Sequence, residues 1–256
     1  MYSIEDDGPI RWLTIDNPSR RNAIAPSEWT VLAGHLSDFE ASGQRSLVLI
    51  GAGGDFCSGA DLAGGVEVLT GAAGAYIQMR RVAAAARALH TLTKPTVAAV
   101  DGVAVGAGMN LALCCDLVVA TTRARFSQIF VRRGLTVDFA GTWLLPRRIG
   151  LARAKELALT GRILGADDAL RHGIAAEVVA PEDLRRRAGE LATELAAAAP
   201  RAQQFAKAGL DRSFEMSFDD ALEYETQAQA LCLNSQDVIE GVRAFLEKRP
   251  PRFEGR

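Results

Sequence analysis

The sequence lacks the features that mark several large classes of protein. No apolar run within its 256 residues reaches the ~20 residues that a membrane-spanning helix needs. The first ten residues, MYSIEDDGPI, have no signal-peptide pattern. The formal net charge of −2 does not favour a broad nucleic-acid-binding surface. We therefore expect a cytoplasmic protein with neither a membrane nor a nucleic acid as partner.

Residues that bind metals are also scarce, with 4 cysteines and 3 histidines. The cysteines show no metal-ligand spacing, and the adjacent Cys114 and Cys115 lie in an apolar segment that is typical of core packing. Reduced thiols fit a cytosolic setting. We expect no metal site, and we expect structural roles for His35, His90 and His172.

Alternating short strands and helices predict a layered α/β fold. Strands are expected at 9–15, 46–50, 96–100, 117–120, 124–126 and 177–179, and helices from 26, at 76–92, 109–115, 148–160 and 167–172, with an irregular loop at 134–146. After Pro181 the composition shifts, and four helices are expected at 182–199, 201–215, 217–234 and 235–248. We place a soft boundary near residue 195, which gives an α/β core at 1–195 and a helical region at 196–256.

The chain is organised around residues 94–116, KPTVAAVDGVAVGAGMNLALCCD. This stretch predicts a buried strand, a turn of small residues at 106–108 and a helix, whose first N–H groups have no partner within the helix. Residues 51–62, GAGGDFCSGADL, repeat the arrangement after another strand and end in Gly59-Ala60 ahead of a possible helix. Two such turns can aim two backbone N–H groups at one carbonyl oxygen, which is an oxyanion hole.

A glycine-rich turn often does no more than reverse the chain, so each turn alone is weak support for a function. A dinucleotide-binding turn is disfavoured, because the third glycine of that motif is replaced by Leu111 after one turn and by Phe56 in the other.

Four blocks of the sequence resemble, in order, the motifs of the crotonase superfamily, the enoyl-CoA hydratase/isomerase family. They are Asn17-Pro18 with Asn22-Ala23, FCSGADL at 56–62, the stretch 95–108 followed by Cys115-Asp116, and KRPPRF at 248–253. The resemblance implies a spiral of ββα units with a C-terminal helical trimerisation region, assembled as homotrimers or as hexamers made of two trimers. It also implies an acyl-CoA thioester as substrate, with no permanently bound cofactor and coenzyme A present only as part of that substrate.

The same resemblance implies the site. The N–H groups of Ala60 and Ala107 match the two donors to the thioester oxygen. Coenzyme A is expected along the loop from Arg20 to Ile24 and along the turn at 55–62. The expected substrate-binding residues are Arg20, Arg21, Asn22, Ala23, Ile24, Asp61, Leu62, Gly106, Asn110 and Phe130. The two arginines can meet phosphates, although paired arginines in a loop are more often solvated.

The sequence departs from the hydratases of this family at both of their glutamates. Asn110 and Phe130 occupy those positions, and neither side chain exchanges a proton. Asp138 is the acid that remains, in the segment GLTVDFAGTWLLP at 134–146, which resembles the loop of an isomerase branch that includes the isomerase of phenylacetate degradation. Val137 and Ala140 stand where that loop has Pro and Gly.

Asp138 is therefore predicted to shuttle a proton beside an apolar wall formed by Phe130 and Phe139. The alternative is an aspartate that caps a turn or is solvated. Asp61 is interpreted mainly as a helix cap. Asn110 is interpreted equally as a substrate contact or as a packed amide. Glu67 and Tyr76, in or beside a glycine-rich segment at 64–74 that is typical of a lid, are interpreted mainly as exposed residues.

The preferred function is isomerisation of an unsaturated acyl-CoA through a stabilised enolate. Two alternatives stay open: an acyl-CoA-binding protein without catalysis, and another crotonase reaction such as C–C or C–S chemistry or weak hydration. The identity of the acyl group is not predicted.

Overall fold

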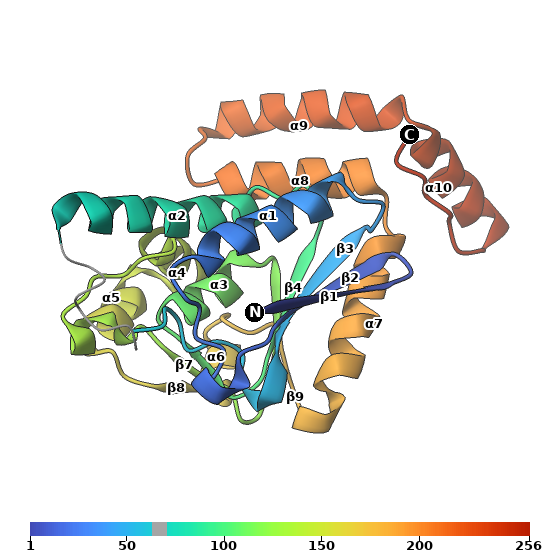
Figure 1. The fold of residues 1–256 in the computed structure, drawn as a ribbon. Helices are drawn as coiled ribbons and strands as arrows, with labels where there is room; N and C mark the ends of the chain where they lie inside the picture. The colour runs from blue at the N-terminus through green and yellow to red at the C-terminus, as the bar shows by residue number, and fades with distance from the viewer. Residues whose placement is uncertain (63–70) are drawn as a thin grey trace.

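The computed structural model describes residues 1–62 and 71–256, which form layers around a six-stranded sheet (Figure 1). The strand order is β1-β2-β3-β4-β6-β9, with β1 antiparallel to β2 and every later pair parallel. Its strands are β1 (Tyr2–Asp7), β2 (Ile10–Ile15), β3 (Ser46–Gly51), β4 (Thr96–Val100), β6 (Leu117–Thr121) and β9 (Glu177–Val179). The predicted α/β class is confirmed.

Helices cover both faces of this sheet. The main hydrophobic core lies between one face and the helices α1 (Glu28–Ala41), α2 (Ala72–His90) and α3 (Ala107–Cys114). On the opposite face, α7 (Leu184–Ala197) packs Leu184, Ala188 and Ala192 against Val48, Val97 and Val119 of the strands. Every residue of β4 is buried, which explains its continuous apolar sequence.

A second, three-stranded sheet lies beside α3 and has the order β5-β7-β8. Its strands are β5 (Val103–Val105), β7 (Arg125–Ser127) and β8 (Leu164–Gly165). A bridge between Cys57 and Ala104 brings the first glycine turn against β5. The sequence patterns did not predict β1, β5 or β8, because short or exposed strands carry little hydrophobic periodicity.

The region after the second sheet differs from the prediction. The irregular loop expected up to residue 146 ends earlier, since α4 (Gly141–Ile149) begins inside it. The single helix expected from 148 to 160 is divided at Gly150, whose φ of 78° cannot continue a right-handed helix, and α5 (Leu151–Thr160) follows. In the described ranges the remaining short helices are α6 (Ala166–Arg171) and the 3-10 turns at Pro18–Arg20, Ala52–Gly54, Ile129–Arg133 and Pro181–Asp183.

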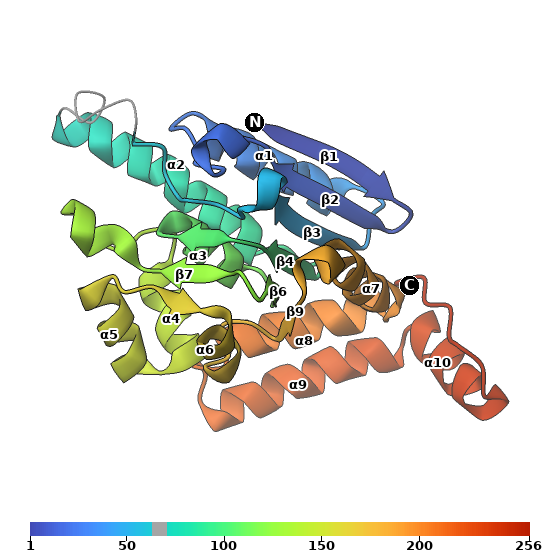
Figure 2. The same ribbon diagram turned by 90° about the horizontal axis from the view of Figure 1, so that it is seen from below.

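The C-terminal helices are α8 (Pro200–Arg212), α9 (Phe218–Leu233) and α10 (Gln236–Glu247). In both views α9 runs alongside α8, and α10 extends from the far end of α9 (Figure 2). All four predicted tail helices are present, but α7 packs on the sheet, so the boundary expected near residue 195 falls in its last turn. No helix in the described ranges is long and apolar enough to cross a bilayer.

Candidate active site

The first glycine turn leaves the backbone of Ala60 exposed to solvent. Gly59 has a φ of 91°, which only glycine adopts readily. The flanking backbone is pinned to Ile24, since the Ile24 N–H donates to the Gly59 carbonyl at 2.8 Å and the Asp61 N–H donates to the Ile24 carbonyl at 2.9 Å. Among the described residues the Ala60 N–H has no backbone acceptor, and Ala60 is exposed. The Ala60 N–H is therefore available to a ligand.

The second glycine turn leaves the N–H of Ala107 without an acceptor in its helix. Gly106 has a φ of 57°, and its N–H donates to the Ser127 carbonyl at 2.8 Å, which fixes the turn to β7. Ala107 is the first residue of α3, so its N–H has no acceptor within the helix. In each turn a left-handed glycine directly precedes the candidate donor.

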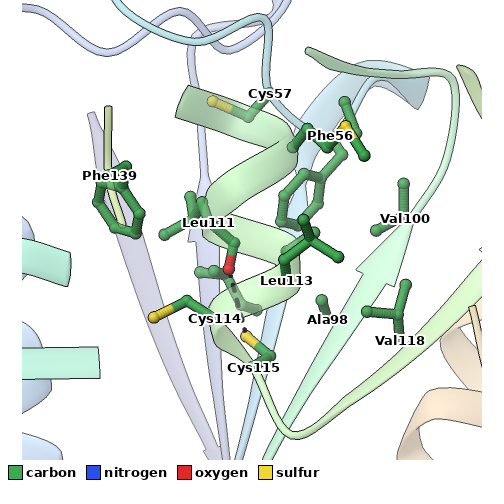
Figure 3. Packing of buried hydrophobic residues seen from close by; sticks show 14 of the residues in the cluster. Phe56, Cys57, Ala98, Val100, Leu111, Leu113, Cys114, Cys115, Val118 and Phe139 are labelled. Carbon is green, nitrogen blue, oxygen red and sulfur yellow. Dashed lines mark hydrogen bonds between the residues drawn. The ribbon is translucent and has the colours of Figure 1, made fainter. Parts of the chain in front are cut away.

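The two turns pack directly against one another. A side-chain carbon placed on Gly59 would lie 3.4 Å from the nitrogen of Ala107 and 3.0 Å from the carbonyl oxygen of Val105. A carbon placed on Gly108 would lie 2.1 Å from the carbonyl oxygen of Cys57, so the backbones meet at a distance that only glycine permits. Cys57 lies at the end of α3 opposite Cys115 (Figure 3). The predicted juxtaposition of the turns is present.

Ala60 does not begin a helix in the described part of the chain. Asp61 and Leu62 have no regular structure, and the residues that follow them, 63–70, are outside the described ranges. The expected cap role of Asp61 therefore stays a prediction, as do the lid segment and Glu67, which lie wholly or partly outside those ranges. Tyr76 is on α2 and is exposed.

Asp138 lies between the 3-10 turn at Ile129–Arg133 and the start of α4. Its carboxyl oxygen Oδ1 is buried and has no hydrogen-bond partner among the described residues. Burial disfavours the ionised form and raises the pKa of Asp138 to about 6. Its main-chain carbonyl, in contrast, accepts hydrogen bonds from the Asn110 amide at 2.8 Å and from the Gly141 N–H at 2.9 Å. The Asp138 main chain is thus held by hydrogen bonds, while the carboxyl oxygen Oδ1 accepts none from the described residues.

Phe130 and Phe139, the two residues predicted to form an apolar wall around Asp138, are both buried. The Phe130 ring is buried and comes within 3.7 Å of a carbon placed on Gly106, beside the second donor. Phe139 is buried too, and its ring centroid lies 5.4 Å from that of Trp29. Figure 3 shows Phe139 on one side of α3 and Phe56 on the other. A wall formed by these two rings around the Asp138 carboxyl group stays a prediction.

The structure supports the packed-amide alternative for Asn110. Its side chain is 0% exposed, and its oxygen Oδ1 accepts from Gln128 Nε2 at 2.7 Å while its amide nitrogen donates to the Asp138 carbonyl. Both ends of the side chain bond to the protein, so the expected substrate contact through this side chain does not match the structure. Gln128 was not predicted from the sequence, because no motif marks its pairing with a residue on another element.

The loop expected to hold coenzyme A divides into exposed and buried residues. Arg20 and Arg21 carry exposed side chains, each 3.8 Å from a carboxylate oxygen, that of Asp61 and that of Asp55 respectively. Distances of this length between exposed groups stabilise little. Both guanidinium groups therefore stay accessible from solvent.

Asn22, Ala23 and Ile24 are buried instead. The Asn22 amide donates to the carbonyls of Ala52 and Asp55 at 2.8 and 2.6 Å, and its oxygen accepts from the Asn17 N–H at 2.8 Å. The buried side chains of these three residues therefore do not match the expected substrate contacts. Asn22 and Ile24 instead tie the loop to the first turn. Leu62, by contrast, is exposed beside Ala60.

An apolar cavity of about 470 Å³ lies elsewhere, between the C-terminal end of α3, α4 and α8. Its walls include Trp143, Arg147 and Phe214, and none of the predicted site residues. His90 packs edge-on against Trp143, with ring centroids 5.0 Å apart, and His35 packs in the same way against Tyr2. Across the described ranges no cluster of three or more His, Cys, Asp or Glu residues has metal-binding geometry.

Comparison with known proteins identifies relatives of this chain in sequence and in structure. The family model described as enoyl-CoA hydratase/isomerase matches residues 5–256. The 1,2-epoxyphenylacetyl-CoA isomerase of Escherichia coli is 39% identical over 96% of this chain and 95% of its own length. The short-chain-enoyl-CoA hydratase of Clostridium acetobutylicum is 33% identical over 98% and 96%. The crystal structure of an enoyl-CoA hydratase/isomerase from Cupriavidus metallidurans superimposes with a TM-score of 0.92 at 34% identity, over 99% of this chain and 96% of that one.

The fold and the paired glycine turns are therefore those of a crotonase-type enzyme. The chain belongs to the enoyl-CoA hydratase/isomerase family. The resemblance read from four short motifs is confirmed along the whole sequence.

Proposed function

We propose that this protein isomerises an unsaturated acyl-CoA thioester by moving a double bond, with Asp138 as the proton shuttle. The observation that carries the proposal is the buried carboxyl oxygen Oδ1 of Asp138, which has no hydrogen-bond partner among the described residues and belongs to a group whose pKa is raised to about 6. A carboxylate with that pKa is ionised at neutral pH and is a stronger base than an ordinary aspartate.

The reaction divides between main chain and side chain. The N–H groups of Ala60 and Ala107 hold the thioester oxygen. Asp138 removes a proton from one carbon of the acyl chain, and the electron pair of that C–H bond becomes part of a conjugated enolate whose charge rests on the held oxygen. The protonated Asp138 then returns the proton to another carbon of the same enolate, so the double bond has moved and the enzyme is restored.

Hydration is the second candidate, because the Clostridium relative bears a hydratase name. The environment at the two positions where hydratases carry glutamates argues against it. Asn110 is buried with its amide committed, and Phe130 presents an apolar ring. Neither activates water, and the ring excludes it.

A panel of 3-enoyl, 2-enoyl and aromatic-ring thioesters of coenzyme A, with the products identified by mass spectrometry and NMR, tests the proposal. We expect a double-bond shift with no gain of mass. A hydroxyacyl product from the 2-enoyl thioester at a rate typical of hydratases would instead show a hydro-lyase. Binding of every thioester with no product would identify an acyl-CoA-binding protein without catalysis.

Coenzyme A is proposed to lie over the exposed part of the N-terminal loop. Arg20 and Arg21 are the cations that its phosphates meet there, and the backbone at Asp61 and Leu62 borders the thioester end. Replacing both arginines with Gln is expected to raise KM for the acyl-CoA and to leave kcat nearly unchanged, because the phosphates lie far from the reacting carbons.

The assembly is proposed to be a homotrimer, alone or paired as a hexamer, in the cytoplasm. The support is the apolar surface of the C-terminal helices, where Leu210, Phe214, Phe218, Phe245 and Leu246 are all exposed in the single chain. Exposed apolar area of this kind usually marks a contact surface. Light scattering during gel filtration distinguishes three or six copies from a monomer.

A further inference from the structure

We propose that Asn110 and Gln128 form a pair of positioning residues that hold the Asp138 loop by its main chain and so leave the Asp138 carboxyl group free to react. The inference rests on the proposed proton-shuttle function of Asp138. It assigns to Asn110 a role different from both substrate contact and simple core packing.

The first link is the hydrogen bond from Asn110 Nδ2 to the Asp138 carbonyl, at 2.8 Å. Asn110 lies one turn after Ala107 on α3, so one short helix carries both the second N–H donor and the anchor of the acid loop. The anchor therefore sets the distance between the held oxygen and the carboxyl group. Geometric control of this kind is what a proton transfer between fixed partners needs.

The second link is Gln128, which decides the orientation of the Asn110 amide. Its Nε2 donates to Asn110 Oδ1 at 2.7 Å, and its side chain is 0% exposed. With Oδ1 accepting from Gln128, the Asn110 Nδ2 faces the Asp138 carbonyl. If the amide were flipped, two oxygens would face each other across that contact.

The loop needs such an anchor because its backbone is strained. Phe139 and Ala140, the two residues after Asp138, have φ values of 46° and 58°, in the left-handed region that L-residues other than glycine adopt at a cost. The next residue is Gly141, where a side-chain carbon would lie 2.3 Å from Asn110 Nδ2. Glycine at 141 therefore allows the amide to approach, and the amide in turn holds the strained turn.

Kinetics of three variants test the proposal: Asn110→Ala, Gln128→Met and, as a control, Ser46→Ala. Ser46 is also buried, and its hydroxyl donates to the Ala192 carbonyl at 2.9 Å, between β3 and α7. We expect Asn110→Ala to lower kcat by about a hundred-fold with KM changed less than about three-fold, since misplacing a reacting group by ~1 Å has that effect. Gln128→Met is expected to lower kcat by about ten-fold, and Ser46→Ala to leave it unchanged while lowering Tm.

A second measurement separates positioning from stability. The acid limb of the kcat profile in Asn110→Ala is expected to move to lower pH, because a released loop exposes the carboxyl group to water. If Asn110→Ala and Gln128→Met only lower Tm, with kcat and the acid limb as in wild type, the positioning role is overturned. A rise in KM at constant kcat overturns it too, because that result assigns Asn110 to substrate binding.

The Asp138→Asn variant keeps failure of this inference distinct from failure of the proposed function. An inactive Asp138→Asn enzyme together with unaffected Asn110 and Gln128 variants overturns only the positioning pair. A fully active Asp138→Asn enzyme overturns the proposed function and, with it, the pair.

Discussion

A side-chain carbon on Gly59 would lie 3.4 Å from the backbone nitrogen of Ala107, although the two residues come from different turns. This close approach of the two turns brings the candidate N–H donors of Ala60 and Ala107 near one another. Because backbone groups meet here, the arrangement does not depend on side-chain rotamers. Preorganisation of this kind underlies electrostatic stabilisation of an enolate.

Gly59→Ala is expected to damage catalysis more than stability. The methyl group would meet the Val105 carbonyl at 3.0 Å, and a φ of 91° is strained for alanine, so the turn must move and carry Ala60 with it. Loss of one donor lowers kcat by about 100- to 1000-fold. Gly150→Ala is the matched control, since its φ of 78° brings similar strain, with no atom within 4 Å of the new carbon. Steady-state kinetics of Gly150→Ala should match wild type, and equal losses in both variants would contradict the account.

Asp138→Asn is expected to stabilise the protein at pH 8 by about 1–3 kcal/mol, because burial opposes the ionised carboxylate and a rise in pKa from 3.8 to about 6 corresponds to roughly that free energy. The raised pKa means that the folded state binds the proton more tightly than the unfolded state, so stability falls as pH rises from about 4 to about 6. The gain from Asn should therefore disappear below about pH 4. Urea unfolding of both proteins at pH 8 and below about pH 4 measures the stabilisation by Asn. An equal stabilisation at the two pH values would show that ionisation of Asp138 is not the cause.

The rate of isomerisation is expected to fall on acidification through about pH 6, since Asp138 must be ionised to accept a proton and its pKa is about 6. A solvent-exposed aspartate would keep its activity down to about pH 4. The kcat/KM profile of the free enzyme gives this value directly. An acid limb at or below pH 4 would mean that the carboxyl group is not buried in the working enzyme.

Ala140→Gly is expected to raise the free energy of unfolding by about 1 kcal/mol, because Ala140 is exposed and has a left-handed φ of 58° that glycine adopts without penalty. Ala84→Gly, on the exposed face of α2, is the control and should lower it by a similar amount through helix propensity. Chemical denaturation measures both. Destabilisation by Ala140→Gly would show that the left-handed backbone at Ala140 carries no strain.

The sequence predicted the parts of the fold that depend on local pattern. The strand at Thr96–Val100 is where the continuous apolar run placed it, because β4 is buried on both faces. The glycines at 59 and 106 indicated two turns, since few other residues tolerate their φ values. Asp138 was singled out from its loop motif, and its catalytic role stays a prediction. The substitution of Ala140 for the usual Gly leaves the left-handed backbone in place.

Hydrogen bonds between residues far apart in the chain could not be predicted from the sequence. The Asn110 side chain was left between two interpretations, because its partners, Gln128 and the Asp138 carbonyl, lie 18 and 28 residues away. Asn22 was assigned to substrate, while the structure uses its amide to join two loops. The start of α4 at Gly141 was missed for the same reason, since a tertiary contact with Asn110, and not a capping motif, marks the end of the loop.

The most direct test of the central claim is deuterium exchange in a 3-enoyl-CoA incubated with enzyme in D₂O and followed by NMR. The account predicts deuterium at the α- or γ-carbon together with a shifted double bond for the wild-type protein, and neither for Asp138→Asn. Exchange that persists unchanged in Asp138→Asn, or a wild-type protein that binds the thioester without any exchange, would contradict it.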